Sequence, residues 1–344
     1  MVINKSATGL GRFSVFNPWF QNYFNRSAVV LGLNTSVDAI ILGNEIDRNI
    51  MDSTGWVDYN PYALQAYQNK LNQTNLSIEY WNLTRYFGIG NWSYFENATL
   101  PVNMTQSQAS IGNKTHFKDW MIIKNQLLAE FLDNVSKSIH DVNSSMPVFV
   151  GLNEIKIESN NGYLSGGIDY GGLFLHHAIV RMTNITGVAY NVVPYTTDIA
   201  GYFYGQAGGL RWKNDKKTIA SELSTQDNTL PKDDLGYKLS IIYSNYFDSY
   251  SFFQWYLDDG VRYMLYNQTS GNLTERGWRI KKLGFSGFEK LNITPDVYIW
   301  VPYSAINMQT TYSYHFNNFL GTITQLNVKY QLVDNITTVP NGSD

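Results

Sequence analysis

Two glutamates, Glu45 and Glu222, stand where their side chains could carry out acid–base chemistry together. Each lies at the end of a short apolar run typical of a buried β-strand, and the chain has only nine glutamates. Two carboxyl groups about 5 to 5.5 Å apart can cleave a glycosidic bond with retention, because one protonates the leaving oxygen while the other attacks the anomeric carbon. Taken singly, either glutamate is more simply a solvated or capping carboxylate.

Bringing such distant positions together requires a particular scaffold, and an alternation of helix and strand patterns supplies one. Apolar residues recur with a period near 3.6 from Phe117 to Ile139, which predicts an amphipathic helix, and a second helix is expected around residues 19–31. Further helices are expected near 170–183, 197–211 and 235–247. Short apolar runs predict strands at 37–43, 147–152, 187–193, 218–223 and 249–255.

Alternating strands and helices of this length imply parallel strands with right-handed crossovers. The two candidate architectures are a (β/α)8 barrel and an open doubly wound sheet. The barrel is favoured because no Gly-x-Gly-x-x-Gly motif follows a strand, and because polar or acidic residues gather at the carboxyl ends of strands, where barrel active sites lie. A long aromatic insertion at 51–116 interrupts the alternation and is expected to lie over these ends.

The span from about residue 12 to 333 resembles the catalytic barrel of glycoside hydrolase family 42, the beta-galactosidase-type members of clan A. The similarity rests on Ile40-Ile-Leu-Gly-Asn-Glu45, on the insertion and the long helix that follows it, on Val188-Ala-Tyr-Asn-Val-Val-Pro194, and on Ile219-Ala-Ser-Glu-Leu223. The resemblance implies an α/β fold, a (β/α)8 TIM barrel of which strands four to eight are present. It places the partial barrel at 1–292 and the beginning of a flavodoxin- or Rossmann-like domain at 293–344.

The same resemblance assigns roles to individual residues. Glu45 would be the general acid/base and Glu222 the nucleophile, and Asn44 would form a hydrogen bond with the sugar 2-hydroxyl. The adjacent pair Asn153-Glu154 is a rival, in which Asn153 matches the family's fifth strand and the glutamate does not. The other expected substrate-binding residues are Tyr190, Asn191, Tyr195 and Trp255, of which Trp255 would form an apolar floor under the sugar ring.

Two alternatives stay open. The residues after Glu45 and after Glu222 differ from the family's pattern, so a catalytically silent, cell-surface glycan-binding or structural barrel is the rival to a retaining glycosidase. If Asn44-Glu45 closes strand four, strands one to three are absent, and five strands would leave two sheet edges unpaired. The expectation is therefore a truncated gene, an internal fragment, a homo-oligomer, or a partner chain that supplies the strands.

Composition narrows the class of protein. The 25 Lys and Arg against 28 Asp and Glu give a net charge of −3, without a cationic cluster, so nucleic acid is not an expected partner. The chain contains no cysteine, which excludes disulfides and cysteine-ligated metal sites. The adjacent His176 and His177 would point in different directions on a helix, so they are not expected to bind one metal ion. Neither a metal nor a cofactor is expected. The expected ligand is a carbohydrate.

Asparagine sequons suggest the compartment. Asn-x-Ser/Thr occurs 18 times, whereas the 36 Asn and 50 Ser plus Thr would give roughly 5 by chance. This excess predicts an extracellular or cell-surface glycoprotein, although residues 1–20 lack the pattern of a signal peptide and no run of 18 apolar residues could span a membrane. The expected glycosylation sites include Asn72, Asn82, Asn91, Asn103, Asn134 and Asn267.

Overall fold

The structure is a computed structural model whose described residues fall into two compact units. One unit comprises residues 1–150 and 158–186, and the other comprises 151–157 and 187–344. The described residues are 4–5, 11–12, 14–43, 46, 51–52, 55–56, 60–81, 92–101, 111–152, 178–179, 181–192, 216–223, 248–252, 265–267, 269–274, 277–278, 281, 295–300, 326, 328 and 330–333. The helices expected at 197–211 and 235–247 lie outside them.

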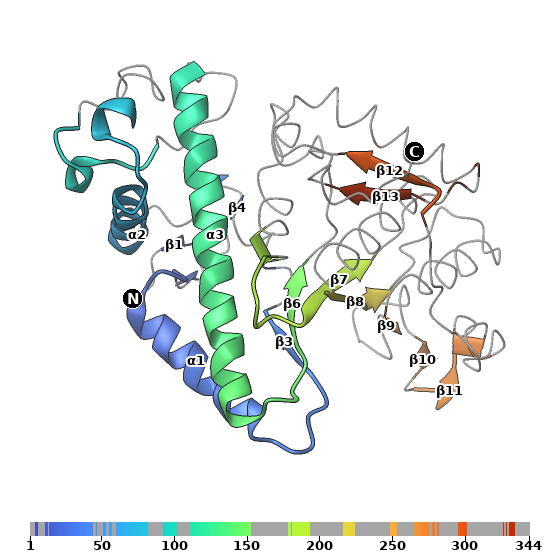
Figure 1. Cartoon of the computed structure of the whole chain (residues 1–344). Coiled ribbons are helices and arrows are strands. Elements are labelled where there is room, and N and C mark those ends of the chain that lie inside the picture. Colours follow the sequence, from blue (N-terminus) through green and yellow to red (C-terminus); the bar gives the residue numbers. More distant parts are fainter. Residues whose placement is uncertain are drawn as a thin grey trace. The chain divides into compact units, whose positions relative to one another are not determined.

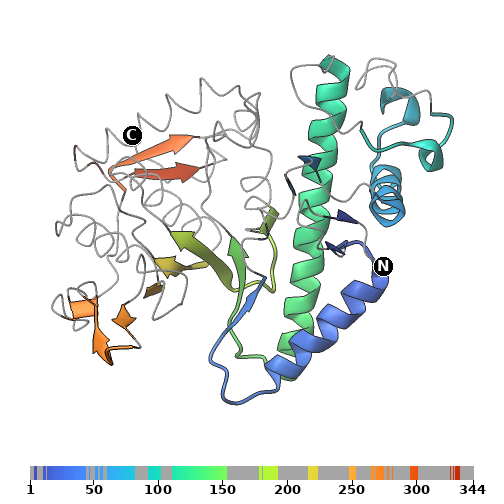
Figure 2. The same cartoon turned by 180° about the vertical axis from the view of Figure 1, so that it is seen from behind.

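Two helices dominate the first unit, and both were predicted from the sequence. Helix α1 spans Pro18–Gly32, and helix α3 spans Ile111–Val142. They lie side by side in both views (Figures 1 and 2). The contact is close because α1 ends in a glycine: a Cβ added at Gly32 would lie 3.0 Å from Cγ2 of Ile139. The rings of Phe24 and Phe131 meet nearer the middle, with centroids 5.8 Å apart.

The insertion at 51–116 contains a packed substructure. Helix α2, Pro61–Asn72, begins at Asn60, whose side-chain oxygen accepts hydrogen bonds from the N–H groups of Tyr62 (3.0 Å) and Ala63 (3.1 Å). The short 3-10 helix η3, Phe95–Asn97, is tied to α2 because Gln68 donates to the carbonyl oxygens of Glu96 and Ala98, both at 2.8 Å. The two-residue pairs β1–β2 (Asn4–Lys5, Gly11–Arg12) and β4–β5 (Met51–Asp52, Gly55–Trp56) also come before α3 in the chain.

The five predicted strands are all present and form one sheet in the order β3-β6-β7-β8-β9. The pairs β3–β6, β7–β8 and β8–β9 are parallel. The predicted α/β class with a parallel sheet is therefore confirmed, whereas the closed eight-stranded barrel stays a prediction. The strand bounds are β3 Ile40–Leu42, β6 Val148–Leu152, β7 Gly187–Val192, β8 Lys217–Leu223 and β9 Ser249–Phe252.

Two smaller sheets follow in the second unit. Strands β10 (Tyr266–Asn267) and β11 (Asn272–Leu273) form a hairpin that turns at Gly271, whose φ of +67° favours glycine. Strands β12 (Val297–Trp300) and β13 (Tyr330–Val333) pair in parallel. A parallel pair needs a crossover connection, which is the type of connection that flavodoxin- and Rossmann-like domains contain. The separate domain from residue 293 stays a prediction.

Candidate active site

In the second unit, two predicted site residues are neighbours on adjacent strands. Asn191, near the end of β7, is the Cα register partner of Glu222, near the end of β8. Both strands run in the same direction, so both positions lie at the carboxyl edge of the sheet. This is the edge at which parallel αβ proteins place ligands and catalytic groups, because side chains from several strand ends meet there.

A β-bulge lies in β8 immediately beside this pair. Ala220 is the partner of Tyr190, and Glu222 is the partner of Asn191, so Ser221 is one extra residue on β8. The pairing of β8 with β9 also contains one extra residue on β8. Leu223 comes three residues after Ala220, whereas their partners on β9, Phe252 and Tyr250, are two residues apart. A bulge changes the face to which the following residue belongs, and bulges are over-represented beside active sites. No pattern in the sequence predicted the bulge.

The register also separates Tyr190 from this pair. Consecutive strand residues belong to opposite faces, so positions 191 and 222 share one face and position 190 lies on the other. Tyr190 is 2% exposed, and Val188, two residues earlier on the same face, is fully buried. Tyr190 is therefore buried on the face of the sheet opposite to positions 191 and 222, and its contribution to a sugar site stays a prediction.

The opposite, amino ends of these strands are fixed by backbone contacts. A Cβ at Gly187 would collide with the carbonyl oxygen of Lys217, so only glycine allows β7 and β8 to begin this close together. Asp248 joins β8 to β9, since its carboxylate accepts the Thr218 N–H at 2.8 Å and its own N–H donates to the Thr218 oxygen at 2.7 Å. These contacts hold the strands whose other ends carry Asn191 and Glu222.

In the first unit, the predicted acid/base follows directly on a glycine turn. Strand β3 ends at Leu42, and Gly43 has a φ of +73°, in the left-handed region that favours glycine. A Cβ at Gly43 would also collide with the side chain of Ile46. The backbone conformation at Gly43, directly after β3 and directly before Asn44 in the sequence, is therefore one that glycine adopts readily. The glycine before Asn-Glu was visible in the sequence, but its role was not.

Several predicted site residues fall outside the described residues. They are Asn44, Glu45, Asn153, Tyr195 and Trp255. Asn153 comes directly after β6, and Trp255 comes three residues after β9, so each is connected to the carboxyl end of its strand. For Asn191 and Glu222, the backbone is described and the side chains are not. Every catalytic role assigned above therefore stays a prediction.

Sequence reasoning missed a buried polar group on α3. His116 is 3% exposed, with its ring centroid 5.9 Å from that of Tyr67 and 5.6 Å from that of Trp92. Burial lowers the pKa of His116 from 6.5 to about 4, against the opposing effect of a backbone hydrogen bond with Thr99, so the imidazole is neutral at pH 7. The 3.6-residue period marked this face of the helix as buried, yet nothing in the pattern singled out a histidine.

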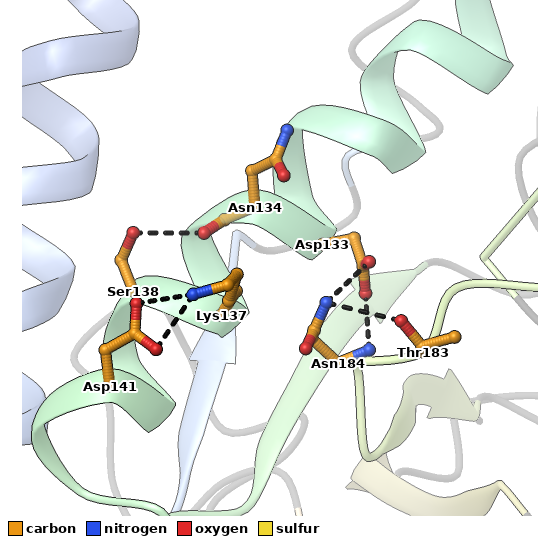
Figure 3. A network of polar contacts seen from close by, with 7 residues as sticks. All are labelled: Asp133, Asn134, Lys137, Ser138, Asp141, Thr183 and Asn184. Carbon is orange, nitrogen blue, oxygen red and sulfur yellow. Dashed lines mark hydrogen bonds and ion pairs between the residues drawn. The ribbon is translucent and has the colours of Figure 1, made fainter.

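A second polar network joins α3 to the segment before β7 (Figure 3). The Asp133 carboxylate accepts the N–H groups of Asn184 (2.7 Å) and Ile185 (3.1 Å), and also the Asn184 side-chain amide (2.9 Å). The Ser136 hydroxyl donates to the Asn184 carbonyl oxygen at 2.5 Å. Ser136 and Asn184 both belong to sequons, so here the sequon residues have a structural use.

The expected glycosylation sites differ in their surroundings. Asn72 and Asn134 are exposed, and the Asn134 side chain points away from the Asp133 network in Figure 3. The Asn267 side-chain oxygen accepts the Ser270 N–H at 3.1 Å, closing a turn. The remaining three, Asn82, Asn91 and Asn103, lie outside the described residues.

The described part of the chain contains no group of three His, Asp or Glu side chains that could hold a metal ion. Nor does it contain a helix that is both long and apolar enough to cross a membrane.

Comparison with known proteins finds similarity in structure only. No protein-family model matches the chain, and no curated protein matches it by sequence. Among solved structures, the beta-galactosidase of the psychrophile Marinomonas ef1 superposes with a TM-score of 0.65 at 13% identity, covering 96% of this chain and 56% of its own.

Two other solved structures give the same result. A GH42 beta-galactosidase from G. stearothermophilus has a TM-score of 0.66 at 11% identity, with 96% of this chain and 52% of its own covered. The beta-galactosidase of the Antarctic haloarchaeon Halorubrum lacusprofundi has a TM-score of 0.64 at 12% identity, with 96% and 53% covered. The chain spans about half the length of these proteins. At such identities the likeness concerns the fold, and over almost its whole length this chain has the fold of GH42 beta-galactosidases.

Proposed function

We propose that this protein is a retaining glycoside hydrolase that cleaves β-linked sugars, with Glu222 as nucleophile and Glu45 as general acid/base. The observation that carries the proposal is the pairing of Glu222 with Asn191 at the carboxyl ends of β7 and β8, beside the bulge at Ser221. It occurs in a chain whose fold is that of beta-galactosidases. A terminal β-galactoside is the first substrate to test, since these neighbours are named for it.

The proposed division of roles follows from the chemistry of retention. The nucleophile must be ionised to attack, and the acid must be protonated before it can donate to the leaving oxygen. Glu45 follows the Gly43 turn at the end of one parallel strand, and Glu222 lies at the corresponding end of another. The carboxyl ends of parallel strands are the positions at which (β/α)8 barrels carry their catalytic groups, and this supports each of the two assignments.

Site-directed variants test the nucleophile directly. Glu222→Gln keeps the size of the side chain and removes the attacking charge, so hydrolysis of p-nitrophenyl β-galactoside should fall by at least about a thousandfold. Glu222→Gly with added azide should regain activity and release an α-galactosyl azide, because azide enters on the face left open by the missing nucleophile. The matched control is Glu96→Gln, an exposed glutamate of η3, which should keep wild-type activity.

The activities of these variants and of two further glutamine variants decide which glutamate is the nucleophile and which is the acid. Full activity in Glu222→Gln, with an unchanged circular dichroism spectrum, would exclude Glu222 as nucleophile. Loss of activity in Glu154→Gln, with normal activity in Glu45→Gln, would transfer the acid role to the rival Asn153-Glu154 pair.

We also propose that the protein acts outside the cell. The sequon excess supports this location, together with the exposure of Asn72 and Asn134. Mapping of glycopeptides from the natural protein by mass spectrometry tests it: glycans are expected at these two positions, and wholly unmodified peptides would contradict it.

A further inference from the structure

The bulge in β8 decides which residues share a face of the sheet. Partner residues of parallel strands belong to the same face, and consecutive residues of one strand belong to opposite faces. Ala220 therefore shares the face of its partner Tyr190, and Ser221, the next residue, belongs to the other face. Glu222 shares the face of its partner Asn191, which is also the face of Ser221. The extra residue thus places two consecutive residues, Ser221 and Glu222, on one face.

The two faces differ in character at the carboxyl edge of the sheet. Position 251, a serine, follows Tyr250, the partner of Ala220, so it shares the face of Asn191, Ser221 and Glu222. We call these four positions the polar face. The opposite face contains only aromatic and aliphatic residues at this edge: Tyr190 and Val192 on β7, Ala220 and Leu223 on β8, and Tyr250 and Phe252 on β9.

A strand without the bulge would give a different arrangement. With regular alternation after Ala220, Glu222 would belong to the aromatic and aliphatic face, where a carboxylate is costly. The bulge assigns Glu222 to the polar face instead, and it keeps Ser221 there as well. The residue next to the proposed nucleophile in the chain is therefore also its neighbour on the same face.

Hydrogen-bond donors, rather than charges, surround Glu222 on this side of the sheet. Among the described residues of β7, β8 and β9, one ionisable residue besides Glu222 belongs to this side, and it is Lys217 at the amino end of β8. Lys217 is exposed and lies at the other end of the strand, so solvent screens its charge at the carboxyl edge. The hydroxyl of Ser221, which is only partly exposed, is a donor adjacent in the chain.

We propose that Ser221 is a positioning residue for Glu222, whose carboxylate accepts a hydrogen bond from the Ser221 hydroxyl. Such a bond favours the ionised form of a carboxylate and fixes its orientation, and attack on the anomeric carbon needs both. The importance of this bond for catalysis rests on the proposed role of Glu222 as nucleophile, whereas the bond itself can be measured without turnover.

Carbon-13 NMR of protein labelled at the glutamate carboxyl carbons tests the hydrogen bond directly. The chain contains nine glutamates, and the signal that disappears in Glu222→Gln identifies Glu222. Ser221→Ala should move the midpoint of its titration to higher pH by about one unit, because the ionised form loses a donor. Ser221→Thr keeps a hydroxyl and should leave the midpoint unchanged. Ser249→Ala should also leave it unchanged, since this matched control belongs to the same side at the amino end of β9.

Kinetics test what the hydrogen bond does in catalysis. In 2,4-dinitrophenyl β-galactoside the leaving group departs without protonation, so the decrease of kcat/KM at acidic pH reports the nucleophile rather than the acid. In Ser221→Ala this decrease should move to higher pH by the same amount as the titration, so kcat/KM at acidic pH should be about tenfold below that of the wild type. Near neutral pH the two proteins should be similar, and circular dichroism verifies that each variant is folded.

The alternatives give different results. An unchanged titration midpoint in folded Ser221→Ala would overturn the proposal. A raised KM with an unmoved pH profile would also overturn it and would indicate contact with the sugar, and a lower melting temperature alone would indicate a structural contact. If the midpoint moves but Glu222→Gln keeps full activity, the hydrogen bond stands and the proposed nucleophile is wrong.

Discussion

Asp133 and Asp141 lie on the same helix and offer a matched comparison of two kinds of polar contact (Figure 3). Asp141 forms an ion pair with Lys137, four residues earlier, at 2.8 Å, and both side chains are more than half exposed. Asp133 accepts three hydrogen bonds from residues about fifty positions away in sequence. The first contact is local to α3, whereas the second ties α3 to the chain that leads into β7.

The two contacts should differ clearly in their contribution to the free energy of unfolding. An exposed i,i+4 pair contributes about 0.3 to 0.5 kcal/mol, so Asp141→Ala should be nearly neutral. Hydrogen bonds to a charged acceptor contribute about 1.5 to 3 kcal/mol each and are not additive. Asp133→Ala also leaves the N–H of Ile185, a residue 1% exposed, without this acceptor. We expect Asp133→Ala to cost about 3 kcal/mol and Asp133→Asn, which keeps one acceptor oxygen, about half of that.

Urea unfolding followed by circular dichroism measures both variants against the wild type. The Asp141→Ala effect should disappear in about 0.5 M salt, because exposed charge pairs are screened, whereas the Asp133→Ala effect should persist. If the two alanine variants had the same unfolding midpoint, the Asp133 network would not be a major tie between α3 and residues 184–185, and the reasoning would be refuted.

Three further predictions follow from single residues. Because burial lowers the His116 pKa to about 4, the unfolded chain binds a proton below pH 6.5 that the folded chain does not. The free energy of unfolding should therefore decrease by about 3 kcal/mol as the pH falls from 6.5 to 4, because each unit of pKa difference corresponds to about 1.36 kcal/mol. Urea unfolding of His116→Gln at several pH values should show a shallower dependence of stability on pH than the wild type shows. Gly43→Ala, at a φ of +73°, should cost about 1 to 2 kcal/mol and lower kcat, whereas unchanged kinetics would separate this turn from the chemistry. Gly187→Ala should destabilise by at least about 2 kcal/mol in thermal unfolding, since its Cβ collides with the Lys217 carbonyl oxygen, and a neutral result would contradict the close approach of β7 and β8.

The elements of the sheet and the long helices could be predicted because each follows from a repeating local pattern. Continuous apolar runs indicated β6 to β9, and a period of 3.6 indicated α3, since burial of a face depends on positions only a few residues apart. The places of Glu222 and Asn191 near strand ends were predictable for the same reason. Their pairing across two strands was not, because register is set by contacts between segments about thirty residues apart.

What the sequence determined by itself was the α/β class, the positions of these strands and helices, and the absence of cysteine chemistry. Only the tertiary structure placed the extra residue at Ser221, the buried neutral His116 and the Asp133 network. Local propensity and periodicity act along the chain and are encoded in neighbouring residues. Bulges, pKa values and polar networks depend on which distant segments come into contact, and only the folded chain decides that.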